Sequence, residues 1–400
     1  MRINRRTSRP LFGSRSRNYS GCLPSLFILS IIIGMVGMSR DWIAEWLLKT
    51  NVSQQSIEAA QAAFARGDLD STIKQAQELW EASPENTDAL ILLARALIYN
   101  SYVDHHLEAD RRRALQLTTN AYNQPLIRTR VQAIHAFALQ ANDRSADATR
   151  MATAAIQRDS NNITARIALA LGYAQQGLFD LGLREARTAV ELADNSDSPW
   201  RMDAYRTLAI ILGDMGRYQE AIANVNQAIG IHRRMIPLYF ERALYAMQIS
   251  DTSNATAAYF QVVALNENNA KAHLRLCEVS VRLREREAAV DYCTQATQLA
   301  PTWSDGWYHL GREYFLQGSL VEARDALKRC TTLQTLQNMP IEERQFECWY
   351  LQGQAAEALG DCDTLVPLYN QFQAMAANSS IEQTWTYPPE GPSICVQAAS

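Results

Sequence analysis

Residues 304–337 read SDGWYHLGREYFLQGSLVEARDALKRCTTLQTLQ. In the first half of this stretch apolar residues recur at helical spacing, as at Trp307 and Leu310, and a second apolar run starts at Ala323. Gly318 separates the two runs, and glycine is common just beyond the end of a helix because it adopts the left-handed conformation without strain. The pattern therefore predicts two amphipathic helices of about four turns each, joined by a tight turn.

Small residues in this stretch lie where the two helices would touch. Gly311 and Ala323 allow the helices to approach each other. The larger Trp307, Leu310 and Tyr314 fill the space around them. The spacing W-x2-L-G-x2-Y resembles that of the tetratricopeptide repeat (TPR), a helix–turn–helix unit of about 34 residues. The resemblance implies a stack of such units, because one helical hairpin cannot bury its apolar faces alone.

Copies of this pattern precede and follow residues 304–337. Three copies run without a gap at 202–235, 236–269 and 270–303. Further copies are predicted to begin at residues 53, 87, 129, 163 and 346, with short spacers between some of them. The sequence therefore predicts an all-α protein of about nine repeats. The TPR resemblance implies that these repeats form a right-handed superhelical solenoid.

The first 40 residues differ in composition from the rest of the chain. They hold seven arginines and no acidic residue, whereas residues 41–400 hold 31 basic and 42 acidic residues. A nucleic-acid-binding surface is usually rich in lysine and arginine. The acidic repeat region therefore makes nucleic acid an unexpected partner.

An uncharged run, residues 19–38, follows the arginine-rich start. Its length is just enough to span a bilayer, and the preceding arginines place the N-terminus in the cytoplasm and the repeats outside it. The alternative is a cleaved signal peptide, which would give a secreted protein. We predict a disordered basic cytoplasmic tail at 1–20, a transmembrane anchor at 21–40, a juxtamembrane helix at 41–52, the solenoid at 53–379 and an irregular tail at 380–400.

Catalytic signatures are missing from the sequence. It contains no GxSxG, Walker, HExxH or CxxC motif and no glycine-rich nucleotide fingerprint. We therefore predict a protein that is not an enzyme, with no catalytic residue, no cofactor and no metal ligand. An enzyme with an unrecognised site near residues 98–113 stays an alternative.

An insertion of about eight residues, centred on VDHHLEAD, separates the helices of the second repeat. Its acidic residues and its two histidines, His105 and His106, have the composition of a metal cluster. Adjacent histidines on an α-helix point about 100° apart, however, which suits a shared metal site poorly. We interpret the insertion as a solvated segment.

Six of the seven cysteines lie in the last third of the chain, at Cys277, Cys293, Cys330, Cys348, Cys362 and Cys395. Two interpretations stay open for them. Cys277 and Cys330 occupy small-residue positions, where cysteine is a reasonable filler. Outside the cytoplasm, disulfides are permitted. The best pair would then be Cys277 with Cys293, at unit positions that face each other in the TPR family, and the next pair would be Cys330 with Cys348.

In the TPR family, the first helix of each unit lines a concave groove that binds peptides or partner proteins. Positions 2, 5, 9 and 12 of the unit point into this groove. The groove residues predicted here are Phe137, Ile167, Leu171, Arg206, Ile210, Phe240, Leu244, Met247, Leu274, Tyr308, Arg312, Phe315 and Tyr350. The alternative is that several of them pack between neighbouring repeats. The family's two-carboxylate clamp of lysine and asparagine is absent, and Arg95, Arg206 and Arg312 are isolated charges.

These residues predict a partner that presents an apolar helical or extended segment. We expect a non-catalytic protein–protein interaction scaffold, anchored in the membrane of a bacterial cell envelope with its repeats outside the cytoplasm. A dedicated subunit of a secretion, pilus or cell-wall assembly machine is the alternative. A small-molecule ligand is not expected, and the identity of the protein partner does not follow from the sequence.

Overall fold

The computed structural model describes residues 56–377, 385–388 and 391–398. These residues form α-helices, two short 3-10 helices and turns, without a β-strand among them. The all-α prediction is confirmed for this part of the chain. The predicted cytoplasmic tail, anchor and juxtamembrane helix lie outside the described residues. Among the helices that are described, none has the length and apolar content needed to cross a membrane.

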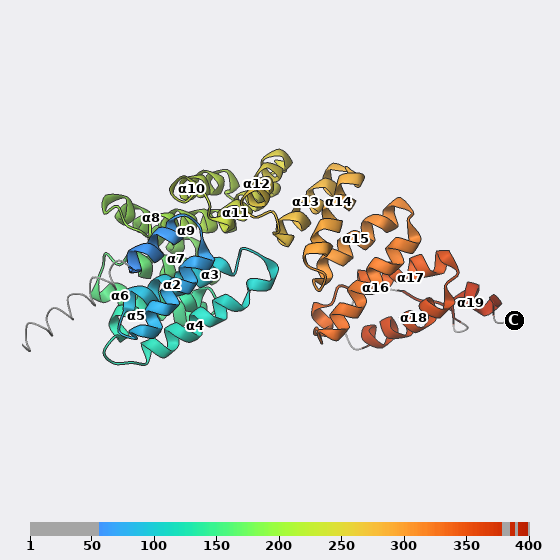
Figure 1. Ribbon diagram of the computed structural model, residues 1–400, viewed down its shortest axis with the longest axis horizontal. Helices are drawn as coiled ribbons and strands as arrows, with labels where there is room; N and C mark the ends of the chain where they lie inside the picture. The colour runs from blue at the N-terminus through green and yellow to red at the C-terminus, as the bar shows by residue number, and fades with distance from the viewer. Residues whose placement is uncertain (1–55, 378–384, 389–390, 399–400) are drawn as a thin grey trace, which may run out of the picture. The chain divides into compact units, whose positions relative to one another are not determined.

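Within residues 57–400, which form one compact unit, the helices are arranged as nine consecutive pairs (Figure 1). The first five pairs are 56–65 with α2 (Leu69–Ala82), α3 (Thr87–Asn100) with α4 (Ala109–Tyr122), α5 (Arg128–Gln140) with α6 (Ser145–Arg158), α7 (Ile163–Gln175) with α8 (Phe179–Asn195), and α9 (Arg201–Asp214) with α10 (Tyr218–Ile231). The last four pairs are α11 (Ile236–Gln248) with α12 (Thr252–Leu265), α13 (Ala270–Leu283) with α14 (Arg286–Leu299), α15 (Ser304–Gln317) with α16 (Leu320–Leu336), and α17 (Glu347–Leu359) with α18 (Cys362–Ala376).

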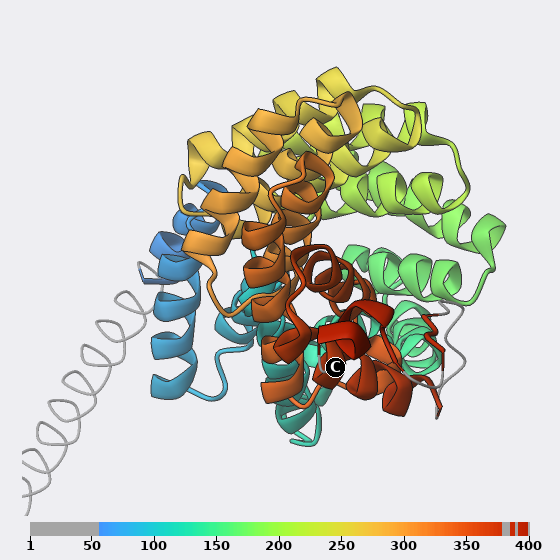
Figure 2. The same ribbon diagram turned by 90° about the vertical axis from the view of Figure 1, so that its right-hand side faces the viewer.

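The first helices of the pairs, from α3 onward, begin within one residue of the predicted unit starts. Asparagine side chains fix several of these starts. Asn86 accepts a hydrogen bond from the backbone N–H of Ala89 at 3.1 Å, and Asn269 accepts one from Ala272 at 2.8 Å. Such N-caps satisfy backbone donors that have no partner within the helix. Seen from its end, this part of the chain places successive pairs around an arc (Figure 2).

Gly311 confirms the close approach expected between α15 and α16. A Cβ atom at this position would lie only 2.6 Å from Leu327 Cγ, so no larger residue fits without movement of the helices. Leu310, next to it, is buried. Gly318 ends α15 with a φ of 80°, in the left-handed region that glycine adopts without strain.

The apolar core differs between two parts of the solenoid. In the N-terminal part, residues 57–248, one continuous cluster extends from Ile57 to Tyr245. In the C-terminal part, residues 270–398, the core is divided into smaller clusters, of which one includes Leu274 and Leu310 and another includes Trp349 and Phe372.

A buried ion pair links α3 to α9 across the N-terminal part. Arg95 donates from Nε to Asp203 Oδ1 at 3.1 Å and forms a second bond from Nη2 to Oδ2. Its guanidinium lies between the rings of Phe64 and Trp200, 4.2 and 4.4 Å from their centroids. The expectation that Arg95 is an isolated charge in the groove is therefore wrong. A solenoid that curves back on itself brings α9 beside α3, and Arg95 and Asp203 become buried at this contact.

The insertion after α3 also makes a contact that is remote in sequence. We call residues 101–108 the strap; it includes the 3-10 helix η1 (His105–Leu107). Asn269 donates to Val103 O at 2.8 Å, and Lys271 Nζ donates to Tyr102 O at 3.0 Å. Asp104 is 6% exposed and accepts hydrogen bonds from the backbone N–H groups of Ala270 and Lys271 at 3.1 and 3.2 Å. The interpretation of the insertion as solvated is wrong, because its carboxylate caps the N-terminus of α13.

Three disulfides tie the C-terminal part together. Cys277 bonds to Cys293, with a Cα–Cα distance of 5.3 Å, and Cys330 bonds to Cys348, with a Cα–Cα distance of 6.1 Å. These are the two pairs predicted from the sequence, so the filler interpretation of Cys277 and Cys330 is wrong. The third disulfide joins Cys362 to Cys395.

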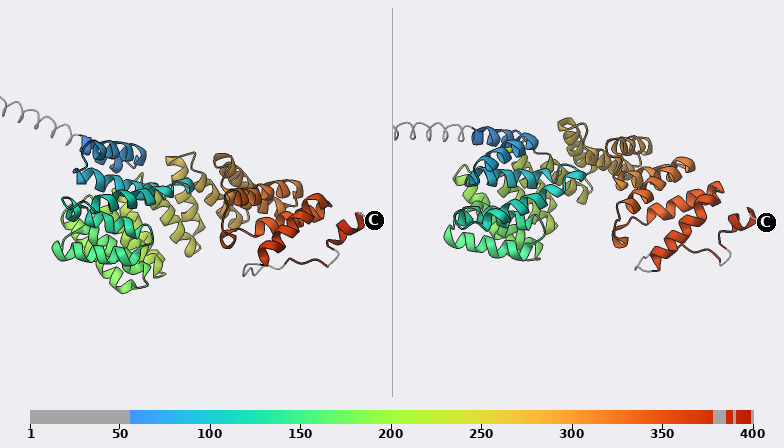
Figure 3. Two further views of the ribbon diagram at one scale, coloured as in Figure 1. Left: turned by 90° about the horizontal axis from the view of Figure 1, so that it is seen from below. Right: turned by 60° about the horizontal axis from the view of Figure 1, so that its bottom comes forward.

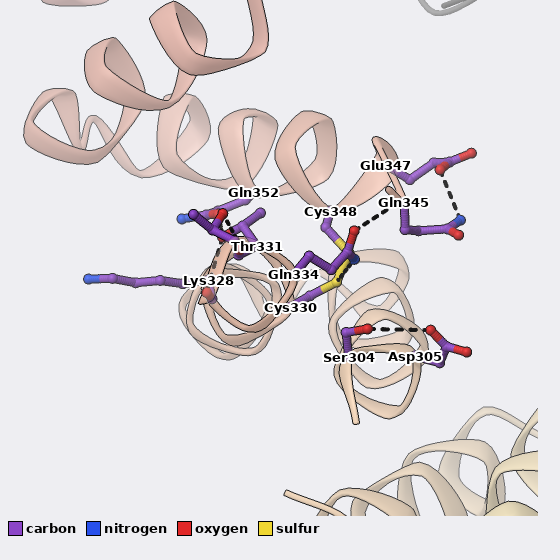
Figure 4. The surroundings of a disulfide bond; sticks show 11 residues. Ser304, Asp305, Lys328, Cys330, Thr331, Gln334, Gln345, Glu347, Cys348 and Gln352 are labelled. Carbon is purple, nitrogen blue, oxygen red and sulfur yellow. Dashed lines mark hydrogen bonds between the residues drawn. A yellow bond between two sulfur atoms is a disulfide. The ribbon is translucent and has the colours of Figure 1, made fainter. Parts of the chain in front are cut away.

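The Cys330–Cys348 disulfide joins α16 to the start of α17 beside the buried Gln334 (Figure 4). Gln334 Nε2 lies 3.0 Å from Cys330 Sγ, and Gln334 Oε1 accepts from the backbone N–H of Gln345 at 2.8 Å. Both ends of this buried amide therefore have partners, as a polar group in a core requires.

Part of the segment predicted to be an irregular tail, residues 380–400, is helical. Residues 393–398 form α19 (Ser393–Ala398), a short helix near the C-terminal end of the ribbon (Figure 3). The Cys362–Cys395 disulfide joins it to the start of α18. Trp385 packs over Gly353 of α17, where a Cβ atom would lie 2.1 Å from the indole. Pro392 directly precedes α19. A proline breaks a helix in its interior but is favourable at its start, and the expectation of an irregular tail did not allow for this.

Candidate partner-binding cavity

A cavity of about 600 Å³ opens on the inner face of the solenoid, among α9, α11 and α13. Its wall also includes Tyr102 of the strap, Gln140 of α5, Leu171 of α7 and Tyr259 of α12. This volume lies within the range of about 300–1,000 Å³ that is typical of ligand pockets.

Helix α11 supplies the apolar side of the cavity. Pro237, Phe240, Leu244 and Met247 follow one another at intervals of three or four residues and all line it. This spacing places them on one face of the helix. Leu244 is 52% exposed, and Phe240 and Met247 are partly exposed. Groove positions 2, 5, 9 and 12 of this repeat therefore all face the cavity.

The predicted groove residues divide into three groups. Six line the cavity, namely Leu171, Arg206, Ile210, Phe240, Leu244 and Met247. Three are packed between helices, namely Phe137, Ile167 and Leu274, each at most 2% exposed. Four are partly exposed on α15 and α17 and do not line the cavity, namely Tyr308, Arg312, Phe315 and Tyr350. The structure thus brings together about half of the predicted set, and the packing alternative holds for the second group.

Charged side chains make up much of the remaining wall. They are Arg206, Glu241, Lys271, Arg275, Glu278 and Arg282. Of these six residues, only Arg206 belongs to the groove residues predicted from the sequence. Lys271 and Glu278 occupy unit positions 2 and 9, so the same positional rule contained the signal for them. Glu241 and Arg275 directly follow position 5 of their repeats, and the rule predicts no groove residue there.

Arg206 and Glu241 form a buried pair at one end of the cavity. Arg206 Nε donates to Glu241 Oε1 at 2.7 Å, and the guanidinium lies 5.2 Å from the ring centroid of Tyr102. Burial raises the pKa of Glu241, although Arg206 opposes the shift. The second carboxylate oxygen, Oε2, is buried and has no hydrogen-bond partner among the described residues.

The other carboxylate of the wall, Glu278, is also paired. Arg275 Nη1 donates to both of its oxygens at 2.7 Å. Lys271 and Arg282, in contrast, have no carboxylate within ion-pair distance in the described part of the chain. Lys271 Nζ lies 4.6 Å from the ring centroid of Phe240, and burial together with Arg275 lowers the pKa of Lys271. The cavity therefore combines an apolar face with two cations that lack a carboxylate partner.

One group of side chains near the cavity has the composition of a metal site. Asp104, His105 and His106 each offer a ligand atom, and these atoms lie within 4.8 Å of one another.

Comparison with known proteins identifies the repeat type. The family model "Tetratricopeptide repeat" matches residues 162–234, which include α7 to α10. The predicted repeat type is thus confirmed for residues 162–234. A search of curated proteins finds no match.

Two solved structures share the fold at low sequence identity. The crystal structure of the APC/C hetero-tetramer Cut9–Hcn1 is 16% identical with a TM-score of 0.54, covering 74% of this chain and 54% of that one. The present chain therefore spans about half the length of that protein. The C-terminal part of a TPR repeat-containing protein from Cytophaga hutchinsonii is 13% identical with a TM-score of 0.50, covering 62% of this chain and 96% of that one. At such identities the likeness concerns the fold alone.

Proposed function

We propose that this protein is a non-catalytic interaction scaffold that binds a segment of a partner protein in the cavity among α9, α11 and α13. The observation that carries the proposal is the exposed apolar face of α11 inside a concave surface. Leu244, at 52% exposure, loses the most water-accessible surface of this face if a partner covers it. TPR solenoids present such concave surfaces to peptides and proteins, and the repeat match supports the same role.

The charges of the cavity suggest what the partner segment contains. Lys271 and Arg282 lack a carboxylate partner within the described residues, so an acidic group next to an apolar side chain would complement both features of the wall. The segment is helical or extended, because both forms can present side chains into a groove. We therefore expect an acidic, partly apolar segment.

A pair of leucine variants tests the cavity. Leu244→Ser changes an exposed residue inside the cavity, and Leu336→Ser changes a 72% exposed residue at the end of α16, outside it. Affinity purification from solubilised membranes followed by mass spectrometry identifies the partner, and titration then measures its affinity. We expect Leu244→Ser to weaken binding more than about tenfold and Leu336→Ser to leave it unchanged. Equal affinities for both variants and the wild type would exclude the cavity as the docking place.

We further propose that residues 19–38 anchor the chain in a membrane and that the repeats lie outside the cytoplasm. The uncharged run and the arginines before it support this topology. The three disulfides support an oxidising compartment. Protease added to spheroplasts should digest the repeats and leave a small membrane-bound fragment. Protection of the repeats would contradict the topology, and a repeat region free in the medium would favour cleavage and secretion.

The same purification separates a general scaffold from a dedicated subunit of a secretion, pilus or cell-wall assembly machine. One stoichiometric partner would favour the subunit, and several substoichiometric partners would favour the scaffold. An enzyme with a site near residues 98–113 stays an alternative.

A further inference from the structure

The strap places the potential ligand atoms of three side chains close together, an arrangement that the sequence did not favour. Residues 105–107 form a 3-10 turn, in which adjacent side chains point about 120° apart, so the turn alone does not direct the two rings to one side. The rings of His105 and His106 have centroids 5.2 Å apart, at an interplanar angle of 71°. Asp104, which directly precedes them, completes a group whose ligand atoms lie within 4.8 Å of one another.

We propose that Asp104, His105 and His106 bind one divalent transition-metal ion, with Zn²⁺ as the best match. Two imidazoles and a carboxylate are ligands that suit Zn²⁺, Ni²⁺ or Cu²⁺, whereas Ca²⁺ and Mg²⁺ require oxygen ligands. Three such protein ligands with a water at the fourth position form a complete Zn²⁺ coordination shell. The proposal does not depend on what binds in the cavity.

The distance between the first two ligand atoms already fits a metal ion. His105 Nδ1 and Asp104 Oδ1 are 2.9 Å apart. Two ligands at about 2.0–2.1 Å from Zn²⁺, with an angle between 90° and 109° at the ion, are separated by roughly 2.9–3.4 Å. The ion takes the place of the hydrogen between these atoms. A neutral ring then carries its single hydrogen on Nε2 in place of Nδ1, so metal binding changes its tautomer and releases no proton.

Asp104 is held in place by groups outside the metal shell. The backbone N–H groups of Ala270 and Lys271 donate to its two oxygens, and the carboxylate is 6% exposed. Such supporting hydrogen bonds raise metal affinity because they fix the orientation of the ligand.

The side chains of the two histidines differ in how freely they can move. His105 is stacked on Trp303, with 4.3 Å between the ring centroids and 8° between the planes. His106 is exposed and meets the His105 ring at its edge. Its ligand nitrogen lies within 4.8 Å of the other two ligand atoms, and a change of its own side-chain torsions would bring it to bonding distance of a shared ion. The fourth position then faces solvent and holds water.

Competing metal ligands are few in the part of the chain that the structure describes. The other four histidines are single and separately engaged: His135 with Thr118, His232 with Ala65 O, His273 with Glu267 O and His309 with Glu278. Six cysteines are in disulfides. A metal ion would therefore bind at the strap in preference to these groups, and it would clamp the strap where it caps α13.

The test is a titration of the full chain, purified in detergent and stripped with a chelator, with Zn²⁺ in a calorimeter. We expect one ion per chain and a loss of at least about tenfold in affinity for His106→Ala. His106 is exposed, so this variant should fold as the wild type does. His309→Ala is the matched control and should bind Zn²⁺ with unchanged affinity.

The visible absorption of bound Co²⁺ provides a second test, because it reports directly on the groups that bind the metal ion. Co²⁺ bound by two imidazoles and a carboxylate absorbs visible light, and this absorption should be present in the wild type and lost in His106→Ala. Failure of the wild type to bind Zn²⁺ saturably would overturn the proposal. Equal Zn²⁺ affinities for His106→Ala and the wild type would overturn it as well, because the ion would then be adventitious.

Discussion

The N-terminal part, residues 57–248, contains no cysteine, whereas residues 270–398 contain six and all six form disulfides. The N-terminal part instead has contacts between repeats that are far apart in sequence, such as Arg95 with Asp203 and His232 with Ala65. It also has one continuous core, where the C-terminal part has several smaller clusters.

The difference shows two ways of stabilising a solenoid. Where repeats contact only their neighbours, the stability of the stack is approximately the sum of the contributions of each repeat and each interface. Distant repeats then contribute nothing to one another. In the C-terminal part, disulfides link neighbouring helices and reduce the conformational entropy of the unfolded chain. In the N-terminal part, curvature brings repeat two beside repeat five, and buried polar contacts couple them. The following changes separate the two modes.

Removal of Asp203 should have the largest effect, and it should act on the N-terminal part. Asp203→Ala leaves the guanidinium of Arg95 buried without its partner, which typically costs about 3–5 kcal/mol. Urea unfolding followed by hydrogen exchange should show protection lost from residues 57–248 first. The double variant Arg95→Met with Asp203→Ala should recover part of the loss. A single variant as stable as the wild type would contradict the importance of this pair.

Reduction of the disulfides should destabilise the C-terminal part selectively. The Cys277–Cys293 disulfide closes a segment with a sequence separation of 16, and for loops near this length the gain in stability is on the order of 3 kcal/mol. We expect the thermal midpoint of residues 270–398 to fall in Cys277→Ser with Cys293→Ser. The N-terminal part has no cysteine and serves as the internal control. Equal loss of protection in both parts would mean that the whole solenoid unfolds as one unit.

The contributions of His135 and Glu313 to stability, one in each part, should change in opposite directions with pH. In the N-terminal part, burial lowers the pKa of His135 from 6.5 to about 4. Since the folded-state pKa lies below the unfolded one, stability is full above pH 6.5 and falls as the pH drops toward 4, by up to about 3 kcal/mol. His135→Gln should flatten this dependence, measured by urea unfolding across the pH range. An unchanged slope in the variant would exclude His135 as its source.

In the C-terminal part, burial raises the pKa of Glu313, whose Oε1 has no partner among the described residues. A folded-state pKa above the unfolded value favours the protonated carboxyl. Its contribution is therefore full below the unfolded pKa and is lost as the pH rises through the folded pKa. Glu313→Gln should remove this dependence and stabilise the protein at neutral pH, as judged from the thermal midpoint. A lower midpoint for the variant at neutral pH would contradict the assignment.

The cavity variant should have the smallest effect on stability. Leu244 is exposed, so Leu244→Ser should change the free energy of unfolding by less than about 0.5 kcal/mol. Leu310→Ser, at a buried position of α15, should cost about 2–5 kcal/mol and serves as the comparison. If both variants melt alike, Leu244 belongs to the core and the cavity loses its apolar docking face.

Local patterns predicted the features that depend on neighbouring residues. The spacing of Leu310 and Gly311 gave the repeat and its register, and unit positions 8 and 24 gave the Cys277–Cys293 pair. Positions 2, 5, 9 and 12 placed α11 correctly in the cavity wall, because this face is set by helical periodicity alone.

Contacts between distant repeats were not predictable in the same way. Arg95 and Phe137 occupy groove positions, yet both are buried because α9 and the segment before it cover them. The strap looked like a polar, solvated insertion because its partners at the start of α13 are 166 or more positions away. A repeat pattern describes one unit and its neighbours, and it carries no information on where the stack curves back.

The strap also has a consequence for how the chain is made. Asp104 and its partner Lys271 are 167 positions apart, and a ribosome adds about 5–20 residues per second. Roughly 10–30 s therefore pass between the synthesis of the carboxylate and that of the helix end it caps. During this interval the first repeats can stack on one another and form the Arg95–Asp203 contact. The strap cannot yet contact α13, so this last step of assembly waits for the seventh repeat.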